Sequence, residues 1–138
     1  MIRTIVTCLA ILLLSLPAFA QSAGERTADE QRFFELYREL VEINTTQSIG
    51  DCTIAAETIA TRLRASGMAN ENIRVIVPPG HPKRGNLIAR IPGSDTDAGA
   101  ILLLAHIDVV EARREDWDRD PFTLFEENGF FYARGASD

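Results

Sequence analysis

The sequence predicts an α/β fold in which helices flank a mixed sheet. Two segments, 29–43 and 51–66, place apolar residues at three- and four-residue spacing, the period of an amphipathic helix. Short β-branched or apolar runs at 72–77, 86–91 and 100–105 follow them and are typical of strands. Helices that precede strands in this order pack as layers on a sheet. The chain has 138 residues, which allows one domain at most.

The first twenty residues have the composition of a secretory signal. Arg3 gives a short positive start, and residues 5–16 are apolar but too few to span a bilayer. The run Pro17-Ala18-Phe19-Ala20 then ends in the small-x-small pattern that signal peptidase cleaves. We therefore predict that 1–20 is a signal peptide and that 21–138 is periplasmic or secreted, with no stable membrane anchor after cleavage. The alternative is an uncleaved amphipathic or membrane anchor.

The negative net charge of the chain argues against nucleic acid and anionic membranes as binding partners. The sequence carries 14 Lys and Arg against 20 Asp and Glu, and loss of Arg3 with the signal peptide makes its net charge of −6 more negative. Nucleic acid and anionic membranes repel such a chain, so neither is an expected partner. A small molecule or a peptide is expected instead. Cys8 also leaves with the signal peptide, so Cys52 has no disulfide partner within residues 21–138.

The predicted helices are separated by a loop and end at recognisable residues. Residues 44–50 break the helical pattern and are predicted to form a loop. Gly67 follows the second helix at the position where a left-handed C-cap is usual. The apolar positions of the two helices are Phe33, Leu36, Tyr37, Leu40, Val41 and Ile43, then Ile54, Ala55, Ile59 and Leu63.

Two of the later segments have distinct strand patterns. The run 100–105 is apolar at every position, which suits a strand covered on both faces. Further along, Asn128-Gly129 separates 123–127 from 130–133. Because Asn-Gly favours the type I′ turn that matches the twist of paired strands, these two segments are predicted to form a hairpin.

A histidine and a carboxylate follow the apolar run directly. His106 is its first polar neighbour, and Asp108 lies two residues further on, so both side chains project from the same face of an extended segment. Ligands of α/β sheets bind outside the carboxyl ends of the strands. One imidazole nitrogen can then bind a metal while Asp108 accepts a hydrogen bond from the other. On these residues alone, a pair that simply pins a loop is an equally open reading.

The end of the sequence supplies a second carboxylate. Arg134-Gly135-Ala136-Ser137-Asp138 follows the predicted hairpin, and its small residues permit close approach of the backbone. We expect Asp138 to be able to return beside His106. The alternative is a solvated loop with no role in binding.

These elements in this order resemble the zinc metallopeptidase family of aminoacylases, carboxypeptidases, dipeptidases and succinyl-diaminopimelate desuccinylases. The resemblance covers most of residues 29–138, and its sharp motifs lie in 102–138. They are Leu104-Ala105-His106-Ile107-Asp108-Val109-Val110, Trp117, Asp120-Pro121-Phe122, Asn128-Gly129, Tyr132 and Arg134-Gly135-Ala136-Ser137-Asp138.

The resemblance implies a role for each matching position. His106 would bind one of two Zn²⁺ ions, Asp138 would bridge both ions, and Asp108 would be the catalytic-site carboxylate that orients His106. Trp117, Pro121 and Phe122 would shape and support the loop. Glu111 and Ala133 depart from the family, which often has proline and glycine at these positions.

The resemblance also implies parts that do not occur before Asp138. The family uses a Glu-Glu pair whose first member is the general base, a further acidic ligand, a distant histidine and a smaller dimerisation domain. We therefore expect 21–138 to be a truncated N-terminal portion of a zinc-exopeptidase-like catalytic domain. A homodimer is expected only of a full-length protein.

The expected function follows from these parts. It is zinc-dependent hydrolysis of amide bonds in small peptides or N-acyl amino acids, by an exopeptidase or amidohydrolase. This fragment alone is expected to be inactive because the base and most metal ligands are missing. The alternative is an exported, non-catalytic module that binds a metal or a peptide.

Overall fold

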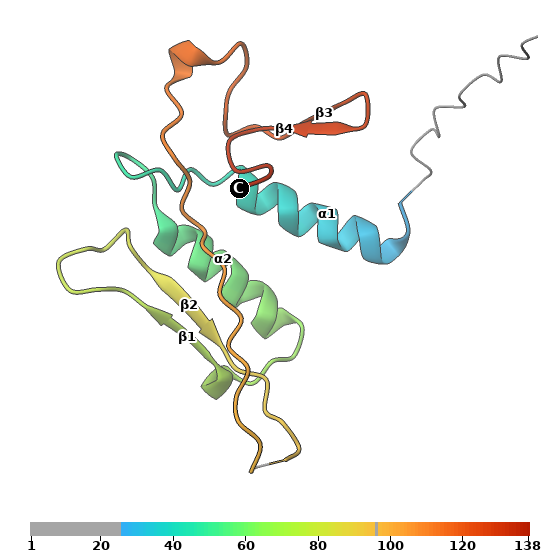
Figure 1. Cartoon of the computed structure of the whole chain (residues 1–138), viewed down its shortest axis with the longest axis vertical. Helices are drawn as coiled ribbons and strands as arrows, with labels where there is room; N and C mark the ends of the chain where they lie inside the picture. The colour runs from blue at the N-terminus through green and yellow to red at the C-terminus, as the bar shows by residue number, and fades with distance from the viewer. Residues whose placement is uncertain (1–25, 96) are drawn as a thin grey trace, which may run out of the picture.

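The computed structural model describes residues 26–95 and 97–138, so the predicted signal peptide, 1–20, lies outside the described part. Within that part no helix is both long and apolar enough to cross a membrane. The elements in chain order are α1 (Ala28–Val41), α2 (Cys52–Ala65), the 3-10 helix η1 (Asn70–Asn72), β1 (Ile73–Ile76), β2 (Asn86–Ala89), the 3-10 helix η2 (Arg114–Asp116), β3 (Phe125–Glu127) and β4 (Phe130–Tyr132) (Figure 1).

Helix α1 confirms the first predicted helix, but it buries a different aromatic side chain. A capping box with Thr27 and Glu30 begins the helix: the Thr27 N–H donates to the Glu30 carboxylate at 2.8 Å. Phe34 is buried, whereas Phe33, which the pattern placed on the apolar face, is 70% exposed. The prediction for Phe33 is wrong because the Phe34 ring stacks on Phe131 of β4, with ring centroids 5.5 Å apart.

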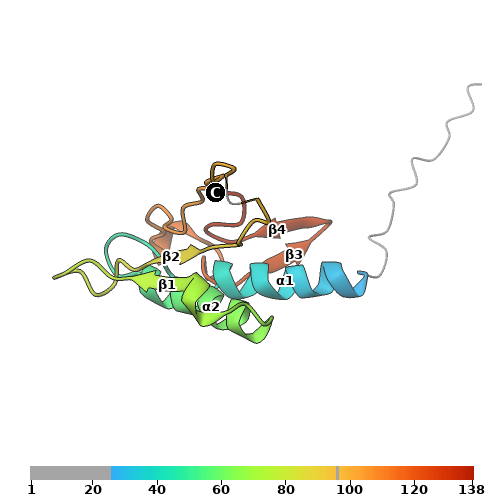
Figure 2. The same ribbon diagram turned by 90° about the horizontal axis from the view of Figure 1, so that it is seen from below.

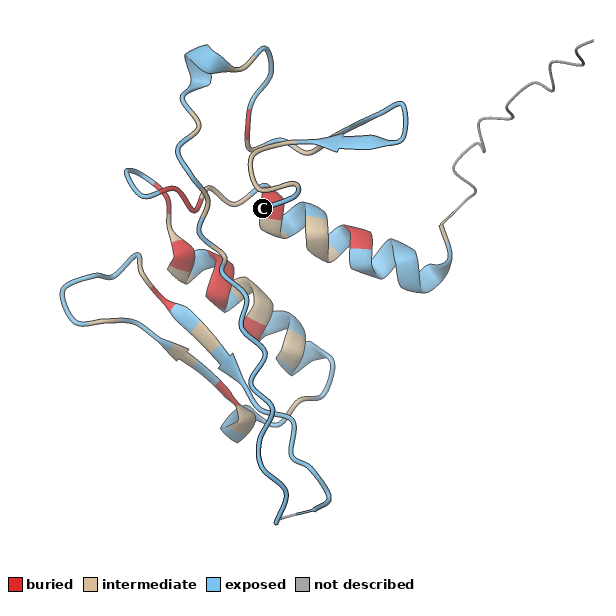
Figure 3. Cartoon of the chain, viewed as in Figure 1, coloured by how far each residue is buried: buried red, intermediate tan, exposed pale blue. Residues whose placement is uncertain are grey.

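Helix α2 confirms the second predicted helix and its cap. The Asp51 carboxylate accepts the N–H of Thr53 at 2.9 Å at the start of the helix. At its end Gly67 has a φ of 92°, and the Met68 N–H donates to the Leu63 carbonyl, as in a Schellman motif. Ile54 is 54% exposed, so its predicted place in the core is wrong. The buried positions are Cys52 and the small residues Ala55, Ala56 and Ala60, and the three alanines let the helix approach the sheet closely (Figure 3).

The strands form two separate antiparallel pairs rather than one mixed sheet. Strands β1 and β2 pair from Ile73↔Ala89 to Ile76↔Asn86, and α2 packs on this pair (Figure 2). Strands β3 and β4 form the predicted hairpin. Its turn residues Asn128 and Gly129 have φ values of 54° and 79°, the positive values that a type I′ turn requires.

The predicted strand at 100–105 does not form. Ile101 to Leu104 are 77% to 89% exposed, and within the described residues no strand pairs with them. A strand needs a neighbouring backbone to satisfy its N–H and C=O groups. Here β2 pairs with β1, and its residues Asn86 and Leu87 line a hollow of about 760 Å³ together with 103–105. The run is therefore extended but unpaired, and it ends at His106.

The contrast between the two neighbouring phenylalanines of α1 is testable. Phe34→Ala is expected to lower the free energy of unfolding by about 3 kcal/mol, because it removes a buried ring that packs on β4. Phe33→Ala, the matched control, is expected to change it by less than about 0.5 kcal/mol. Urea unfolding followed by circular dichroism measures both. An equal loss in the two variants would show that α1 does not pack on β4 through Phe34.

Candidate metal centre

The candidate site lies where the segment that begins at His106 passes the C-terminal loop. The imidazole Nε2 of His106 and the Oδ1 of Asp138 are 2.9 Å apart, although 32 positions separate the residues in the sequence. The C-terminus lies beside the C-terminal end of α1 (Figure 1). Tyr37 of α1 contributes to this placement, since its hydroxyl donates to the Ala136 carbonyl at 2.7 Å. The structure thus brings together the two residues that the sequence proposed as metal ligands.

The second imidazole nitrogen of His106 faces Asp108, but through a different group than expected. Its Nδ1 lies 2.9 Å from the main-chain oxygen of Asp108 and 3.7 Å from the nearer carboxylate oxygen. A main-chain carbonyl fixes the orientation of the ring as a carboxylate would. The Asp108 side chain remains 70% exposed. Asp108 thus lies beside the imidazole, but its carbonyl oxygen and not its carboxylate is within hydrogen-bond distance of Nδ1.

Both imidazole nitrogens of His106 face oxygen acceptors, which favours the protonated ring. The hydrogen bond to the Asp108 carbonyl, followed by the Asp138 carboxylate, raises the pKa of His106 above its usual value of 6.5. When Nδ1–H donates to the carbonyl and the ring is neutral, the Nε2 lone pair faces the Asp138 oxygen. A neutral nitrogen and a carboxylate oxygen that converge in this way are a donor pair that Zn²⁺ accepts.

The 44–50 loop holds the segment that carries His106. The Thr45 hydroxyl donates to the Ile107 carbonyl at 2.7 Å, and Thr46 forms an isolated parallel bridge with Val109. Both threonines are at most 2% exposed. Gly50 closes the loop so tightly that an added Cβ would lie 2.1 Å from the Thr46 nitrogen. Sequence reasoning identified the loop but missed this supporting role, for which two adjacent threonines next to a glycine were the available signal.

The loop that carries Asp138 is anchored by the residues predicted to support it. The Arg134 N–H donates to the carbonyl of buried Pro121 at 2.7 Å, and the Arg134 guanidinium lies 5.2 Å from the centre of the Trp117 ring. Gly135 has a φ of 85°, and an added Cβ would lie 2.9 Å from Val109. The close approach expected of small residues in this loop is thus observed at Gly135.

A hollow of about 510 Å³ lies beside the two side chains. The side chains of His106 and Asp138 are 61% and 86% exposed, so the pair faces solvent. Within residues 26–95 and 97–138, no group of three or more His, Cys, Asp or Glu side chains is placed to hold a metal. The residues that line the hollow and carry polar side chains include Gln47, His106, Asp108, Glu111, Arg134 and Asp138.

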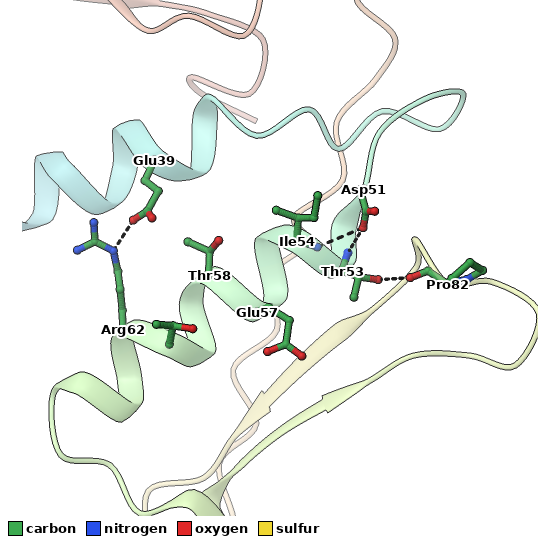
Figure 4. Close-up of a pocket in the computed structure, with 9 residues that line it drawn as sticks. Glu39, Asp51, Thr53, Ile54, Glu57, Thr58, Arg62 and Pro82 are labelled. Atoms are coloured by element: carbon green, nitrogen blue, oxygen red, sulfur yellow. Dashed lines mark hydrogen bonds and ion pairs between the residues drawn. The ribbon is translucent and has the colours of Figure 1, made fainter.

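A second hollow of about 410 Å³ lies between α1 and α2 and contains none of the predicted site residues (Figure 4). Its carboxylates have structural partners. Asp51 caps α2, and Glu39 forms an ion pair with Arg62 that links the two helices. The hydroxyl of Thr53 donates to the Pro82 carbonyl at 2.6 Å. These contacts join α2 to its surroundings and leave the His106 site as the candidate for chemistry.

Known proteins are similar to this chain in sequence. Residues 102–138 match peptidase family M20/M25/M40. Aminoacylase-1 of Sus scrofa is 34% identical over 104 residues, which are 75% of this chain and 24% of that protein. Acetylornithine deacetylase of Dictyostelium discoideum is 34% identical over 125 residues, which cover 80% of this chain and 28% of that protein.

A further relative is more similar over a shorter stretch. The N-fatty-acyl-amino acid synthase/hydrolase PM20D1 of Mus musculus is 52% identical over 48 residues, 35% of this chain and 10% of that protein. The chain spans about a quarter of the length of aminoacylase-1.

The apposition of His106 and Asp138 predicts a measurable shift of protonation. The pKa of His106 is expected to lie above 6.5 and to fall in Asp138→Asn, because the amide keeps the shape of the side chain but loses its charge. An NMR pH titration in a His81→Gln background, which removes the other imidazole of the sequence, measures it. Since the folded pKa is raised, the stabilisation is complete below the unfolded value of 6.5 and is lost as pH rises through the folded value. An unchanged pKa in Asp138→Asn would show that the two side chains do not meet in solution.

Proposed function

We propose, since this chain belongs to peptidase family M20/M25/M40, that it forms part of an exported zinc-dependent amidohydrolase or exopeptidase. The observation that carries the proposal is the 2.9 Å approach of His106 Nε2 to Asp138 Oδ1. These atoms come from the end of an extended segment and from a remote loop, and several buried contacts hold each of them. A site for a divalent cation is the use that best fits such a pair.

The donor atoms at the site fit zinc. Imidazole nitrogen and carboxylate oxygen are both common zinc ligands, and Asp138 has two oxygens with which to bridge two ions. A complete site would hold two Zn²⁺, with His106 on one ion and Asp138 between them. Zinc bound there would activate a shared water and polarise the scissile carbonyl. The proposal includes a glutamate as general base that residues 21–138 do not supply, and with it the inactivity of these residues alone.

The roles of the residues in the chain itself are positional and electrostatic. The Asp108 carbonyl accepts a hydrogen bond from Nδ1–H, which leaves Nε2 as the nitrogen that can bind a metal. The Asp108 carboxylate, 3.7 Å from Nδ1, adds a negative charge beside the ring. Thr45 fixes the carbonyl of the intervening residue, Ile107. Together these contacts keep the imidazole aimed at Asp138.

The proposed substrates are N-acyl amino acids or small peptides. Two of the relatives, acetylornithine deacetylase and N-fatty-acyl-amino acid synthase/hydrolase, have names that specify an acylated amino acid. The hollow beside His106 and Asp138 is open to solvent, as a substrate site must be. The acidic composition, −6 overall, supports a small-molecule partner rather than nucleic acid. Export through the signal at 1–20 and homodimerisation of a full-length protein are further parts of the proposal.

A second candidate function is an exported module that binds a metal or peptide without turnover. It is favoured by one observation: the described residues place two predicted ligands together but no group of three. Hydrolysis distinguishes the two candidates, whereas zinc binding is common to both.

Zinc binding tests the proposed ligands. The full chain is expected to bind Zn²⁺ weakly, and His106→Ala or Asp138→Asn should each weaken binding by roughly tenfold or more, because each removes one of two ligands. Isothermal titration calorimetry at pH 7.5 measures the affinity. His81→Ala is the matched control, since it removes the other histidine of the sequence, which lies in an exposed turn. Equal losses in His81→Ala and His106→Ala would contradict the assignment.

Hydrolysis tests the reaction class. In a polypeptide that continues past Asp138 and carries the remaining ligands, zinc-dependent release of an amino acid from its N-acetyl derivative is expected. Asp108→Asn should lower kcat while substrate binding persists, because it removes the negative charge beside the His106 imidazole and Asp108 does not contact substrate in this proposal. A full-length protein that binds zinc and substrate without turnover would favour the non-catalytic module.

A further inference from the structure

We infer that Glu111 is a positioning residue that locks the 44–50 loop onto the metal-binding segment, an inference that rests on the proposed function. Its carboxylate binds one residue of the loop with both oxygens. The Ser48 N–H donates to Oε1 at 2.8 Å, and the Ser48 hydroxyl donates to Oε2 at 2.7 Å. The two residues are 63 positions apart in the sequence. Such a two-point contact fixes the orientation of the loop as well as its distance.

Glu111 stays ionised while it makes this contact. The Ser48 hydroxyl and then the Ser48 main chain lower the pKa of Glu111 below its usual value. Both oxygens accept hydrogen bonds from Ser48, and the described residues do not group Glu111 with further potential metal ligands, although it lines the same hollow as His106 and Asp138. Its place in the site is therefore structural support.

The contact of Glu111 is one of three contacts that join the 44–50 loop to the segment that carries His106. The other two join Thr45 to Ile107 and Thr46 to Val109. The segment residues are 107, 109 and 111, and alternate residues of an extended chain present their backbones to the same edge. The first two ties use main-chain atoms of the segment, which any residue offers. The third uses a side chain, so it alone can be removed by substitution within the segment.

The contact between Glu111 and Ser48 positions the part of the loop that borders the hollow. Gln47 precedes Ser48 and lines the hollow together with His106 and Asp138. On its other side the Gln47 carbonyl accepts a hydrogen bond from the Arg84 guanidinium. The loop is thus anchored on one side by Arg84 and on the other by Glu111. Without the Glu111 contact, the loop keeps only the anchor at Arg84 on this part of its chain. The segment that carries His106 can then shift relative to the loop.

Two single variants and their combination test the positioning role. Glu111→Ala is expected to weaken Zn²⁺ binding to the full chain about tenfold, the usual effect of losing a group that orients a ligand. Ser48→Ala removes the hydroxyl hydrogen bond but keeps the one from the Ser48 N–H, so it should weaken binding by a smaller factor. The double variant should bind Zn²⁺ no more weakly than Glu111→Ala alone, because Glu111→Ala already removes both hydrogen bonds to Ser48. Ser48→Ala leaves the negative charge in place, so its effect separates positioning from simple charge attraction. Glu111→Gln should recover part of the affinity, since its amide oxygen still accepts one hydrogen bond.

Glu115→Ala is the matched control and should leave zinc affinity unchanged. Glu115 lies in η2 on the same connection and is exposed. If Glu111→Gln loses as much affinity as Glu111→Ala while Ser48→Ala loses none, the carboxylate acts through its charge, and the positioning role is overturned.

Amide hydrogen exchange separates a failure of this inference from a failure of the proposed function. Exchange at Gln47 and Ser48 should accelerate in Glu111→Ala, whether or not zinc is present, while the melting temperature changes little. Unchanged exchange overturns the tie itself. A wild-type chain that binds no zinc overturns the proposed metal site, and the exchange result still reports whether Glu111 holds the loop.

Discussion

The approach of His106 to Asp138 is the interaction on which the site depends. The two side chains come from segments that are remote in the sequence, and contacts with other residues position each segment. Thr45 and Thr46 support the histidine segment, whereas Tyr37 and Pro121 support the loop of the aspartate. Because both side chains are exposed, their attraction in water is weak, so the supporting contacts and not the pair itself determine the geometry.

Local signals in the sequence were sufficient for the elements that are stabilised locally. The cap at Gly67 and the turn at Asn128-Gly129 depend on backbone conformations that these residues adopt readily, and both are observed. Apolar periodicity found both helices but misassigned Phe33 by one position, since the choice between two adjacent phenylalanines depends on where Phe131 lies. Periodicity defines a face to within one residue, and a contact with a remote element decides the rest.

Non-local pairing accounts for the errors. An apolar run such as 100–105 predicts a strand from composition, but a strand exists only where a neighbour satisfies its backbone, and the described residues provide none. The same limit applied at the site. Spacing placed His106 and Asp108 together, yet it could not show that the Asp108 carbonyl and not its carboxylate would be nearest to Nδ1. The contacts of Thr45, Ser48 and Glu111 cross about 60 positions of sequence, and no local pattern reports them.

The exposed run and the two-ligand site are consequences of one arrangement. The extended segment that leaves Ile101 to Leu104 uncovered delivers His106 at its end, so an element that pairs with the run would also fix the direction in which the imidazole enters the site. The run contributes no order of its own while it is unpaired. The position of His106 therefore depends on the residues that follow it, where the 44–50 loop contacts residues 107, 109 and 111. For this reason we expect Glu111 to affect the position of His106 although it lies away from the proposed metal ligands. The 44–50 loop, and not the unpaired run 101–104, then determines the geometry of the candidate metal centre.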